Sequence, residues 1–478
     1  MKVLQLGKFF PIQGGVERVM VDLMGGLSER GIPCDMLCAA VGDDCGELKV
    51  NEHASIFRVP AWGKLAATMI SPSMVSTLKR ICRQYDIIHV HHPDPMACLA
   101  LYLSGYSGRV VLHWHSDIAK QRILLQFYRP LQHWLLHRAD VIVGTSPVYL
   151  AESPCLEHWQ HKVVALPIGI QPLQPDSQAV QALRRQYGGR HVVFSLGRLV
   201  HYKGYRYLVE AARYLTDDYV VLIGGTGKLH DELQSLIQRW HVTDRVQLLG
   251  RVSDHDLPAY YGMCDLFCLS SVQKTEAFGI VQIEAMSCGK PVVATRIPQS
   301  GVAWVNSDGE SGLNVEPCDA RALAHAIMTL CSDDALYQRL SSGARERFDK
   351  IFTYDKMIDN TLTIYNQLWK KYVVDDNERN VDKERLLALL DSIVSSMYER
   401  QVLSVHIREF ETTYDAELRY LVRNGLAIIT SSGQVQFFHQ TLFDYVYARL
   451  FIENGHDLLE ELKAQHQGLF SRAAVKSI

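Results

Sequence analysis

Two glutamates, Glu276 and Glu284, stand eight positions apart in the segment TEAFGIVQIEAMSCGKPVVAT, with Gly279 between them. If a helix begins near Gly279, its first backbone N–H groups are free to bind a phosphate, because the opening turn of a helix leaves these donors unpaired. Glu284 would then reach back toward a ribose, and Glu276, before the helix, would accept hydrogen bonds from sugar hydroxyls. A capped helix with an ordinary surface glutamate is the alternative.

Two cations form a second group in FSLGRLVHYKGYRYLVEA, where Arg198 and Lys203 follow a predicted strand. A leaving diphosphate gains negative charge as the bond to it breaks, so cations aimed at it stabilise the transition state more than the ground state. Two solvated basic residues in a loop are the alternative. Beside the glutamate pair, we expect Arg198 and Lys203 to hold a leaving diphosphate without a metal ion.

Glycines and histidines in the amino-terminal part give weaker signals. Gly14 and Gly15 separate a predicted strand from a predicted helix, where a ligand can approach the backbone, although a tight connection explains them equally well. His115 ends the predicted strand RVVLHWHS, and His113 lies two residues earlier on the same face. A lone histidine is more often a structural hydrogen-bonding group than a catalyst. We expect His115 to position a ligand rather than to transfer protons.

The elements that must hold these residues repeat one pattern twice. Runs of β-branched residues alternate with amphipathic helical stretches, which is typical of a parallel sheet wrapped by helices. The pattern starts again near residue 175, which predicts an α/β protein with Rossmann-like domains at 1–175 and 176–374 facing across a cleft. The predicted strands are KVLQLG, CDMLCAA, DIIHVHH, RVVLHWHS and ADVIVGTS in the first domain, and HVVFSLGRL, YVVLIGGTG, RVQLLGRV, LFCLSS and PVVATR in the second.

The carboxyl-terminal part departs from this pattern. Residues 352–372 are predicted to form a helical pair that closes the second domain and packs back toward the first, and a charged linker follows. Beyond the linker, three stretches have helical periods, and LAIITSSGQVQFF predicts a hairpin turning at Ser431 to Gly433. We expect a small α+β domain at 375–478, with helices at 382–400, 416–425 and 439–455.

Composition restricts the class of protein. A net charge of -3 gives no electrostatic case for nucleic acid. The eleven cysteines contain no Cys-x-x-Cys pair and the first residues lack a signal-peptide pattern, which predicts a cytoplasmic location. Since no run reaches the roughly 18 apolar residues of a spanning helix, membrane contact is expected to be peripheral.

Apparent motifs for metal and membrane binding are more simply explained by ordinary helix structure. Asp254 and Asp256 fit the D-x-D metal motif, but we expect them to cap the helix DLPAYYGMCD. Neither a GxxxxGK[ST] loop nor zinc-ligand spacing is present in the sequence. The segment AKQRILLQFYRPLQHWLLHRAD has apolar and basic residues suited to an anionic membrane, yet Pro130 interrupts its stripe, so a core helix is favoured.

The glutamate segment matches, residue for residue, the E-x7-E signature of family 4 of the retaining glycosyltransferases, and GRLVHYKG matches the same family's Arg–Lys arrangement. From Met1 to about Tyr372 the chain resembles this family, which implies the GT-B fold. The resemblance implies that Glu276 contacts the transferred sugar, that Glu284 binds the donor ribose, and that Arg198 and Lys203 bind the pyrophosphate.

The same resemblance extends the expected site. It implies that His115 contacts the sugar near its anomeric centre and that the backbone near Val252 meets the nucleobase. No metal or other cofactor is implied. The expected catalytic residues are Glu276, Arg198, Lys203 and His115, and the expected donor-binding residues are Gly14, Gly15, Val252, Ala277, Phe278, Gly279 and Glu284.

The tail carries a separate resemblance. LRYLVRNGLAIITSSGQVQFFHQTLFDYVYARLF is similar to the winged-helix segment of NACHT-type signalling ATPases. Since the ATPase motifs are absent, this implies only a module for protein contact or self-association. The acidic stretch HDLLEELKAQ and the lack of a dense basic patch disfavour DNA binding.

These observations give one hypothesis and one alternative. The hypothesis is a retaining glycosyltransferase that moves a sugar from a UDP- or GDP-linked donor to a glycan or lipid-linked acceptor in bacterial surface polysaccharide assembly. It would act in the cytoplasm, with peripheral contact at the inner face of the membrane. The alternative is a non-catalytic nucleotide-sugar sensor that signals through the carboxyl-terminal module.

Overall fold

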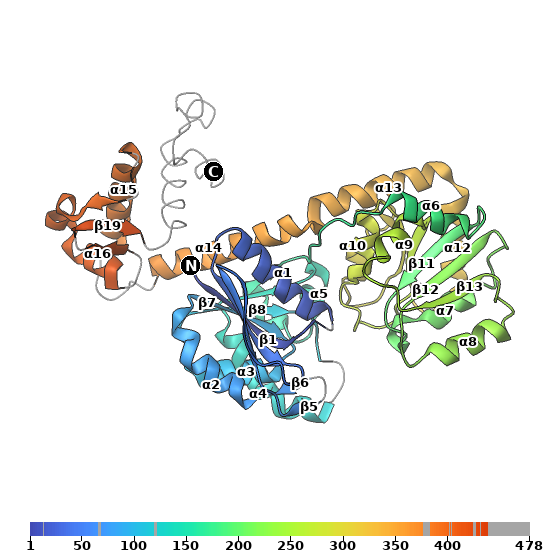
Figure 1. Ribbon diagram of the computed structural model, residues 1–478, viewed down its shortest axis with the longest axis horizontal. Helices are drawn as coiled ribbons and strands as arrows, with labels where there is room; N and C mark the ends of the chain where they lie inside the picture. The colour runs from blue at the N-terminus through green and yellow to red at the C-terminus, as the bar shows by residue number, and fades with distance from the viewer. Residues whose placement is uncertain are drawn as a thin grey trace. The chain divides into compact units, whose positions relative to one another are not determined.

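The computed structural model describes residues 1–12, 14–65, 68–118, 122–375, 383–400, 402, 404–423, 427–430 and 432–437 (Figure 1). Contacts divide the chain into two compact units: Lys2–Tyr365, and Asn366–Ile478 together with Met1. The first unit contains two parallel sheets, which we call the first and second Rossmann-like domains. Each unit is described by itself.

The first Rossmann-like domain is built on an eight-stranded sheet ordered β10-β9-β8-β7-β1-β2-β4-β3. All neighbouring strands are parallel except the β3–β4 pair, which is antiparallel. The five strands predicted for this domain are confirmed, whereas the exposed edge strand β3, its neighbour β4 and the short edge strand β10 were not predicted. The strands are β1 (Val3–Phe10), β2 (Cys34–Ala40), β3 (Gly46–Asn51), β4 (Ala54–Val59), β7 (Ile87–His92), β8 (Arg109–Trp114), β9 (Val141–Gly144) and β10 (Val163–Ala165).

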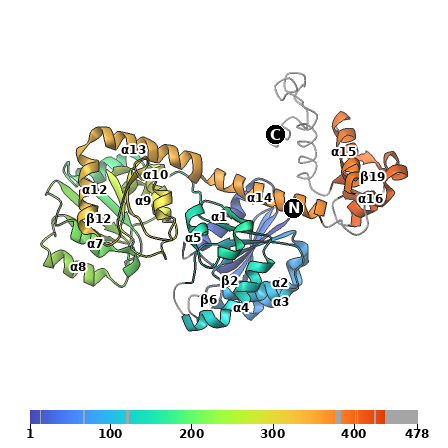
Figure 2. The same cartoon turned by 180° about the vertical axis from the view of Figure 1, so that it is seen from behind.

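Helices cover both faces of this sheet (Figures 1 and 2). The apolar core of the domain lies between one face and helices α2, α3 and α4, where Leu6, Val90 and Leu112 from three strands are fully buried. Helix α1 covers the opposite face, and a two-stranded hairpin, β5–β6, lies beside α3. The bounds are α1 (Gly15–Glu29), β5 (Gly63–Leu65), β6 (Thr68–Ile70), α2 (Pro72–Ile81), α3 (Pro95–Ser104), α4 (Arg122–Arg138) and α5 (Pro147–Glu152).

Helix α4 lies in the segment for which the sequence offered two interpretations, a core helix and a helix on a membrane surface. Its second half packs into the core through Leu135 and Leu136, as the core interpretation predicts. Its first half also packs there through Leu125 and Tyr128, whereas Phe127 is 81% exposed and Leu124 is 45% exposed. The packing into the core is therefore confirmed, and the membrane interpretation stays a prediction.

The second Rossmann-like domain has a six-stranded, fully parallel sheet ordered β13-β12-β11-β14-β15-β16. Its five predicted strands are confirmed, and β16 is additional. The bounds are β11 (His191–Leu196), β12 (Tyr219–Gly224), β13 (Val246–Gly250), β14 (Leu266–Leu269), β15 (Val292–Thr295) and β16 (Gly312–Val315), with helices α6 (Ser177–Arg185), α7 (Tyr205–Ala211), α8 (His230–Arg239), α9 (Leu257–Met263), α10 (Ile280–Ser287), α11 (Val302–Val305), α12 (Ala320–Ser332) and α13 (Asp334–Arg347).

Two local predictions for this domain are wrong. Asp256 does not cap α9 with its side chain, because its carboxylate accepts from the Ser253 hydroxyl at 2.7 Å and Ser253 Oγ accepts from the Asp256 N–H at 3.1 Å. Residues 352–372 form no helical pair: a π-helical turn, Phe348–Phe352, leads into one 22-residue helix, α14 (Tyr354–Asp375). The helical period carries on without a break, so one helix accommodates the whole stretch.

The start of α14 contacts the first Rossmann-like domain. The Tyr354 hydroxyl donates to the Asp22 carbonyl at 3.0 Å, and Arg30 pairs with Asp355 and Asp359 at 2.9 and 2.8 Å. The backbone before α14 also bonds to residue 170, since the Ile170 N–H donates to the Phe352 carbonyl at 2.9 Å. The chain therefore returns to the first domain after completing the second.

The carboxyl-terminal unit has its own small core, which includes Leu389, Ile393, Leu421 and Val435. The predicted first two helices and the hairpin are confirmed, and a short strand, β17, completes a three-stranded antiparallel sheet ordered β17-β19-β18. The helix predicted at 439–455 lies outside the described residues. The elements are α15 (Lys383–Glu399), β17 (Val405–His406), α16 (Glu411–Arg423), β18 (Ala427–Ile429) and β19 (Gln434–Phe437).

We predict that Gly204→Ala destabilises the protein strongly, because Gly204 has φ +64° and an added Cβ would lie 2.0 Å from the Ser270 carbonyl oxygen. Gly188→Ala is the matched control, with φ +57° and nothing within 4 Å of the added Cβ. The control should lose only the roughly 1–2 kcal/mol of the left-handed backbone. Thermal and urea unfolding followed by circular dichroism measure both, and equal losses would contradict the predicted clash.

Candidate functional site

The strand order of the second domain brings the two predicted charge clusters together. Strand β11 lies between β12 and β14. The chain passes from β11 to β12 on one side and later adds β14 on the other side of β11. Loops that follow two such strands open side by side at the carboxyl edge of the sheet, where ligands of open α/β sheets bind. The loop after β11 carries Arg198 and Lys203, and the loop after β14 carries Glu276.

Lys203 and Glu276 form a direct ion pair, with Nζ and Oε2 2.6 Å apart. Only about a tenth of either side chain is exposed, so water screens the pair weakly. The Ser271 hydroxyl donates to the same carboxylate oxygen at 3.0 Å. Sequence patterns predicted separate roles for this lysine and this glutamate, and the structure adds that each is the other's partner.

Backbone contacts hold the lysine in place. Lys203 ends a 3-10 turn, His201–Lys203, and the next residue, Gly204, has a left-handed backbone with φ +64°. The Ser270 hydroxyl donates to the Lys203 carbonyl at 3.0 Å. Since the backbone of Ser270 leaves no room for a side chain at 204, glycine is required for this close approach.

Arg198 lies apart from the buried pair. It is exposed, and its guanidinium donates to the Tyr202 hydroxyl at 3.3 Å. Lys203 Nζ lies 5.8 Å from the centroid of the Tyr202 ring. The structure thus connects the two cations through Tyr202 but leaves Arg198 in solvent.

The helix expected near Gly279 is α10, which begins at Ile280. Gly279 precedes it with φ +76° and has no side chain to cap the opening N–H groups. An added Cβ at 279 would lie 2.8 Å from Leu269. An uncapped helix start attracts anions through its free N–H groups and the helix dipole.

Glu284 lies in the second turn of α10. It accepts a hydrogen bond from the Tyr261 hydroxyl at 2.5 Å. Burial raises the pKa of Glu284, against the opposing effects of this hydrogen bond and of the charges on Lys203 and Arg18. Arg18 belongs to the first Rossmann-like domain, so both domains act on this carboxyl.

The glycine turn of the first domain lies against the same helix. Gly14 has an extended backbone at the start of α1, and a Cβ added at Gly15 would lie 3.2 Å from Ile280 Cδ1. The starts of α1 and α10 are therefore neighbours. The first N–H groups of a helix are in general free to bind an anion.

The remaining predicted donor residues lie on neighbouring loops. Val252 follows β13, and its Cγ2 would lie 3.0 Å from a Cβ added at Gly224, the last residue of β12. Ala277 packs against the core of the first domain, and its carbonyl accepts from the Gly301 N–H at 2.9 Å. Phe278 is buried and makes an edge contact with Phe352, with ring centroids 5.8 Å apart.

His115 follows β8 in the first domain and is nearly buried. The backbone N–H of His115 donates to the His92 carbonyl at 3.1 Å, and the ring Nε2 of His115 lies 2.9 Å from His91 Nδ1. Burial is the main cause that lowers the pKa of His115 well below its usual value. A ring held neutral at physiological pH suits a positioning role. His113 stacks on His115, with ring centroids 3.9 Å apart.

Sequence reasoning missed the contacts that join the first and second Rossmann-like domains near these loops. Asp117, two residues after His115, pairs with Lys274 of the second domain at 3.6 Å and accepts from Trp114 Nε1 at 3.0 Å. Nearby, the Gln299 N–H donates to the Glu152 carboxylate at 3.0 Å. No local pattern marks these pairs, because each joins residues far apart in the chain.

Two parallel sheets of Rossmann type, with a charged site on the loops of the second and the start of α1 beside it, define the GT-B class of glycosyltransferases. Family models agree: residues 13–170 match "Glycosyltransferase Family 4" and residues 180–347 match "Glycosyl transferases group 1". The chain belongs to this family of glycosyltransferases.

Named relatives cover the same part of the chain. An O-antigen chain mannosyltransferase of Escherichia coli is 32% identical over 372 residues, which is 77% of this chain and 99% of the relative. A D-rhamnosyltransferase of Pseudomonas aeruginosa is 30% identical over 358 residues, 74% of this chain and 92% of the relative. The chain is therefore a glycosyltransferase related to enzymes of O-antigen and lipopolysaccharide assembly.

Solved structures share the fold. Anabaena HepE in complex with UDP superposes with a TM-score of 0.64 at 21% identity, over 77% of this chain and all of that one. Sucrose-phosphate synthase from Thermosynechococcus elongatus gives a TM-score of 0.63 at 21% identity with the same coverage. The family matches end at residue 347, so the winged-helix resemblance of the tail stays a prediction.

We predict that Glu276→Ala and Glu276→Gln both reduce sugar transfer by about 10²–10³-fold, the usual loss for a group that acts on the transition state. Their stabilities should differ. Alanine leaves Lys203 without its partner and should lower the free energy of unfolding by about 3 kcal/mol, the low end for a broken buried pair. Glutamine can still accept from Ser271 and should lose less.

Urea unfolding and a transfer assay separate the two effects. Glu232→Gln, an exposed glutamate in the first turn of α8, is the matched control and should change neither quantity. Full transfer activity in Glu276→Gln would remove Glu276 from the reacting centre.

Proposed function

We propose that the protein transfers a sugar from a nucleoside-diphosphate sugar to a hydroxyl of a glycan or lipid-linked acceptor, with retention of the anomeric configuration. The Lys203–Glu276 pair, buried beside the start of α10, is the observation that carries the proposal. One ligand could bind both groups, with its diphosphate on the cation and its sugar hydroxyls on the carboxylate.

Donor binding would rearrange this pair. The diphosphate would take the Lys203 ammonium, the Arg198 guanidinium and the N–H groups at the start of α10, because all three attract anions. The Glu276 carboxylate, released from its partner, would then accept hydrogen bonds from sugar hydroxyls. Glu284 would bind the ribose, as the family resemblance implies.

The reaction follows from the charges that these groups can hold. The bond between the anomeric carbon and the diphosphate oxygen breaks, and both electrons leave with the diphosphate. The acceptor hydroxyl attacks from the face that the diphosphate leaves, and its proton passes to a donor phosphate oxygen. Cations placed around the departing diphosphate stabilise it more as its charge grows, so we propose that no metal ion is needed.

Relatives guide the choice of donor and acceptor. The similar E. coli and P. aeruginosa proteins are named as transferring mannose and D-rhamnose, and the Anabaena structure contains UDP. We therefore propose a UDP- or GDP-linked hexose or deoxyhexose as donor. Bacterial surface polysaccharide assembly is the proposed setting.

We predict that one nucleotide-sugar from a panel of UDP- and GDP-linked donors, mannose and D-rhamnose included, raises the melting temperature and supports transfer or slow hydrolysis. A ligand that binds only the native state stabilises it by mass action. NMR of the product reports the anomeric configuration, and added EDTA should leave the rate unchanged. Binding without turnover would favour the sensor alternative, and an inverted product would contradict retention.

We also propose peripheral contact with an anionic membrane through the start of α4. Leu124 and Phe127 lie one turn apart and are both exposed, and Arg129 follows on the same helix, also exposed. Exposed apolar side chains beside a basic residue suit the boundary between lipid headgroups and acyl chains. Among the described helices, none has the length and hydropathy needed to cross a bilayer.

We predict that Leu124→Ser/Phe127→Ser weakens binding to phosphatidylglycerol vesicles by about tenfold or more, since burial of two apolar side chains is lost. Vesicle flotation measures the bound fraction. Val50→Ser, which changes an exposed apolar residue on β3, should bind like the wild type. Equal binding of the double variant and the wild type would contradict the proposal.

A further inference from the structure

A layer of polar side chains lies buried on one face of the first sheet, away from the apolar core. Gln5 on β1, His89 and His91 on β7 and His113 on β8 all belong to it, because alternate residues of a strand share a face and the strands pair in register. All four side chains are 0–1% exposed. Buried polar groups are normally hydrogen-bonded, so each contact in this layer constrains the others.

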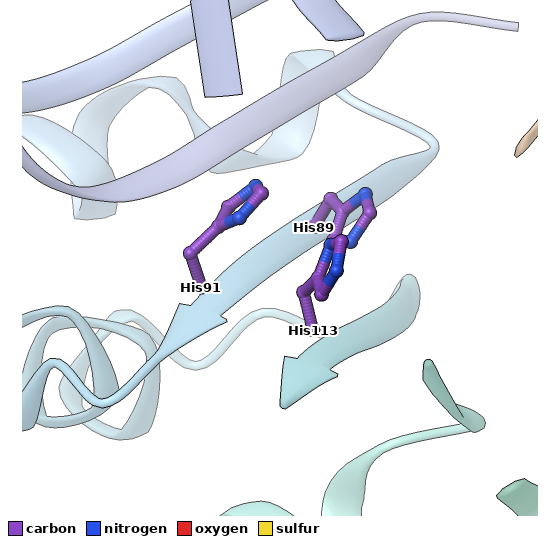
Figure 3. A group of neighbouring side chains, drawn as sticks. All are labelled: His89, His91 and His113. Atoms are coloured by element: carbon purple, nitrogen blue, oxygen red, sulfur yellow. The ribbon is translucent and has the colours of Figure 1, made fainter. Parts of the chain in front are cut away.

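Three of these histidines are close enough to suggest a metal ion, since the candidate ligand atoms of His89, His91 and His113 lie within 4.8 Å of one another (Figure 3). The spacing of histidines in the sequence did not predict this group. However, both ring nitrogens of His91 are already engaged.

The contacts of His91 instead form a chain. Its Nε2 lies 2.8 Å from Gln5 Oε1, and its Nδ1 lies 2.9 Å from His115 Nε2. Gln5 is held from its other side, where its Nε2 donates to the Tyr365 hydroxyl at 3.2 Å. The Tyr365 hydroxyl also forms a hydrogen bond with His89 Nδ1, 2.6 Å away. An amide held at its nitrogen presents its oxygen to His91.

Charge and hydrogen-bonding rules fix the protons in this chain. An amide oxygen only accepts, so His91 Nε2 must carry a hydrogen. Burial lowers the pKa values of His91 and His115 well below normal, so both rings are neutral and each has one N–H. His91 Nδ1 is then an acceptor, and His115 Nε2 must donate to it. His115 Nδ1 is left with a lone pair.

We infer that Gln5 and His91 are positioning residues that lock His115 in the Nε2–H tautomer, so that its Nδ1 can accept a hydrogen bond from a sugar hydroxyl but cannot donate one. The inference rests on the proposed function for the identity of that ligand. This tautomer makes His115 selective for a hydrogen-bond donor, such as a hydroxyl, on the bound sugar. The inference also extends the site to β1 and, through Tyr365, to α14.

Histidine tautomers can be read directly by NMR, because protonated and unprotonated ring nitrogens differ in ¹⁵N chemical shift. In ¹⁵N-histidine-labelled wild-type protein, we expect His115 to show a protonated Nε2 and an unprotonated Nδ1. Gln5→Met removes the acceptor at nearly constant volume, and His91→Phe removes the link while keeping a ring. Both variants should give His115 a mixture of tautomers.

Kinetics provide the second measurement. The same two variants should lower kcat/KM for the donor about tenfold, mainly through a higher KM, because the lost preference acts on sugar binding. His92→Gln is the matched control: His92 follows His91, is equally buried, faces the opposite side of the sheet and pairs with Gln132 at 3.1 Å. It should leave the His115 tautomer and the donor KM unchanged.

Three results would overturn the inference. The first is a protonated Nδ1 on His115 in the wild type, and the second is an unchanged His115 spectrum in Gln5→Met. The third is stoichiometric zinc in the purified protein that disappears in His113→Gln, because the cluster would then be a metal site. A wild type that transfers no sugar from any donor would refute the proposed function instead, and the tautomer measurement would still stand.

Discussion

The ion pair between Lys203 and Glu276 is the interaction on which the site depends. A lysine and a glutamate this deeply buried need each other, because an unpaired charge in the same place would be strongly destabilising. The pair exists because β11 and β14 are neighbours in the sheet, which sets the loops after them side by side. Gly204 then allows the two loops to approach closely enough for contact.

The ion pair also keeps the Lys203 ammonium and the Glu276 carboxylate together in a form that a ligand could separate. An ammonium and a carboxylate in contact satisfy each other while the site is empty, and a molecule with an anionic half and a hydroxyl-bearing half can replace both partners at once. The start of α10 adds amide donors on the anionic side. In the proposed function, binding energy and catalytic charge would therefore come from the same few groups.

The first domain contributes through a different kind of constraint. In its buried layer, hydrogen bonds rather than ion pairs join Gln5, His89 and His91, while His113 stacks on both histidines. The layer ends at His115, two residues before Asp117, which pairs with Lys274 of the second domain. Tyr365 closes the layer from α14, so the helix that follows the second domain completes a network in the first.

Local sequence patterns were enough to predict most of the strands and one helix start. Alternating apolar runs predicted ten strands, because a buried parallel strand needs a continuous run of β-branched residues, and the Glu276–Glu284 spacing indicated a helix start between them. Prediction failed where local pattern and structure separate: in the exposed strand β3 only Leu48 and Val50 are apolar, so no continuous apolar run marks it, and Asp256 has a competing partner in Ser253.

Which of these residues contact one another depends on how the strands and domains pack in three dimensions. A strand pattern shows which face a side chain takes, yet it does not show which strand lies beside it. The pairs Lys203–Glu276, Asp117–Lys274 and His91–His115 all follow from strand order and domain contact. Strand order is set by packing summed over the whole sheet, so residues distant in the chain acquire a shared chemistry only when the chain has folded.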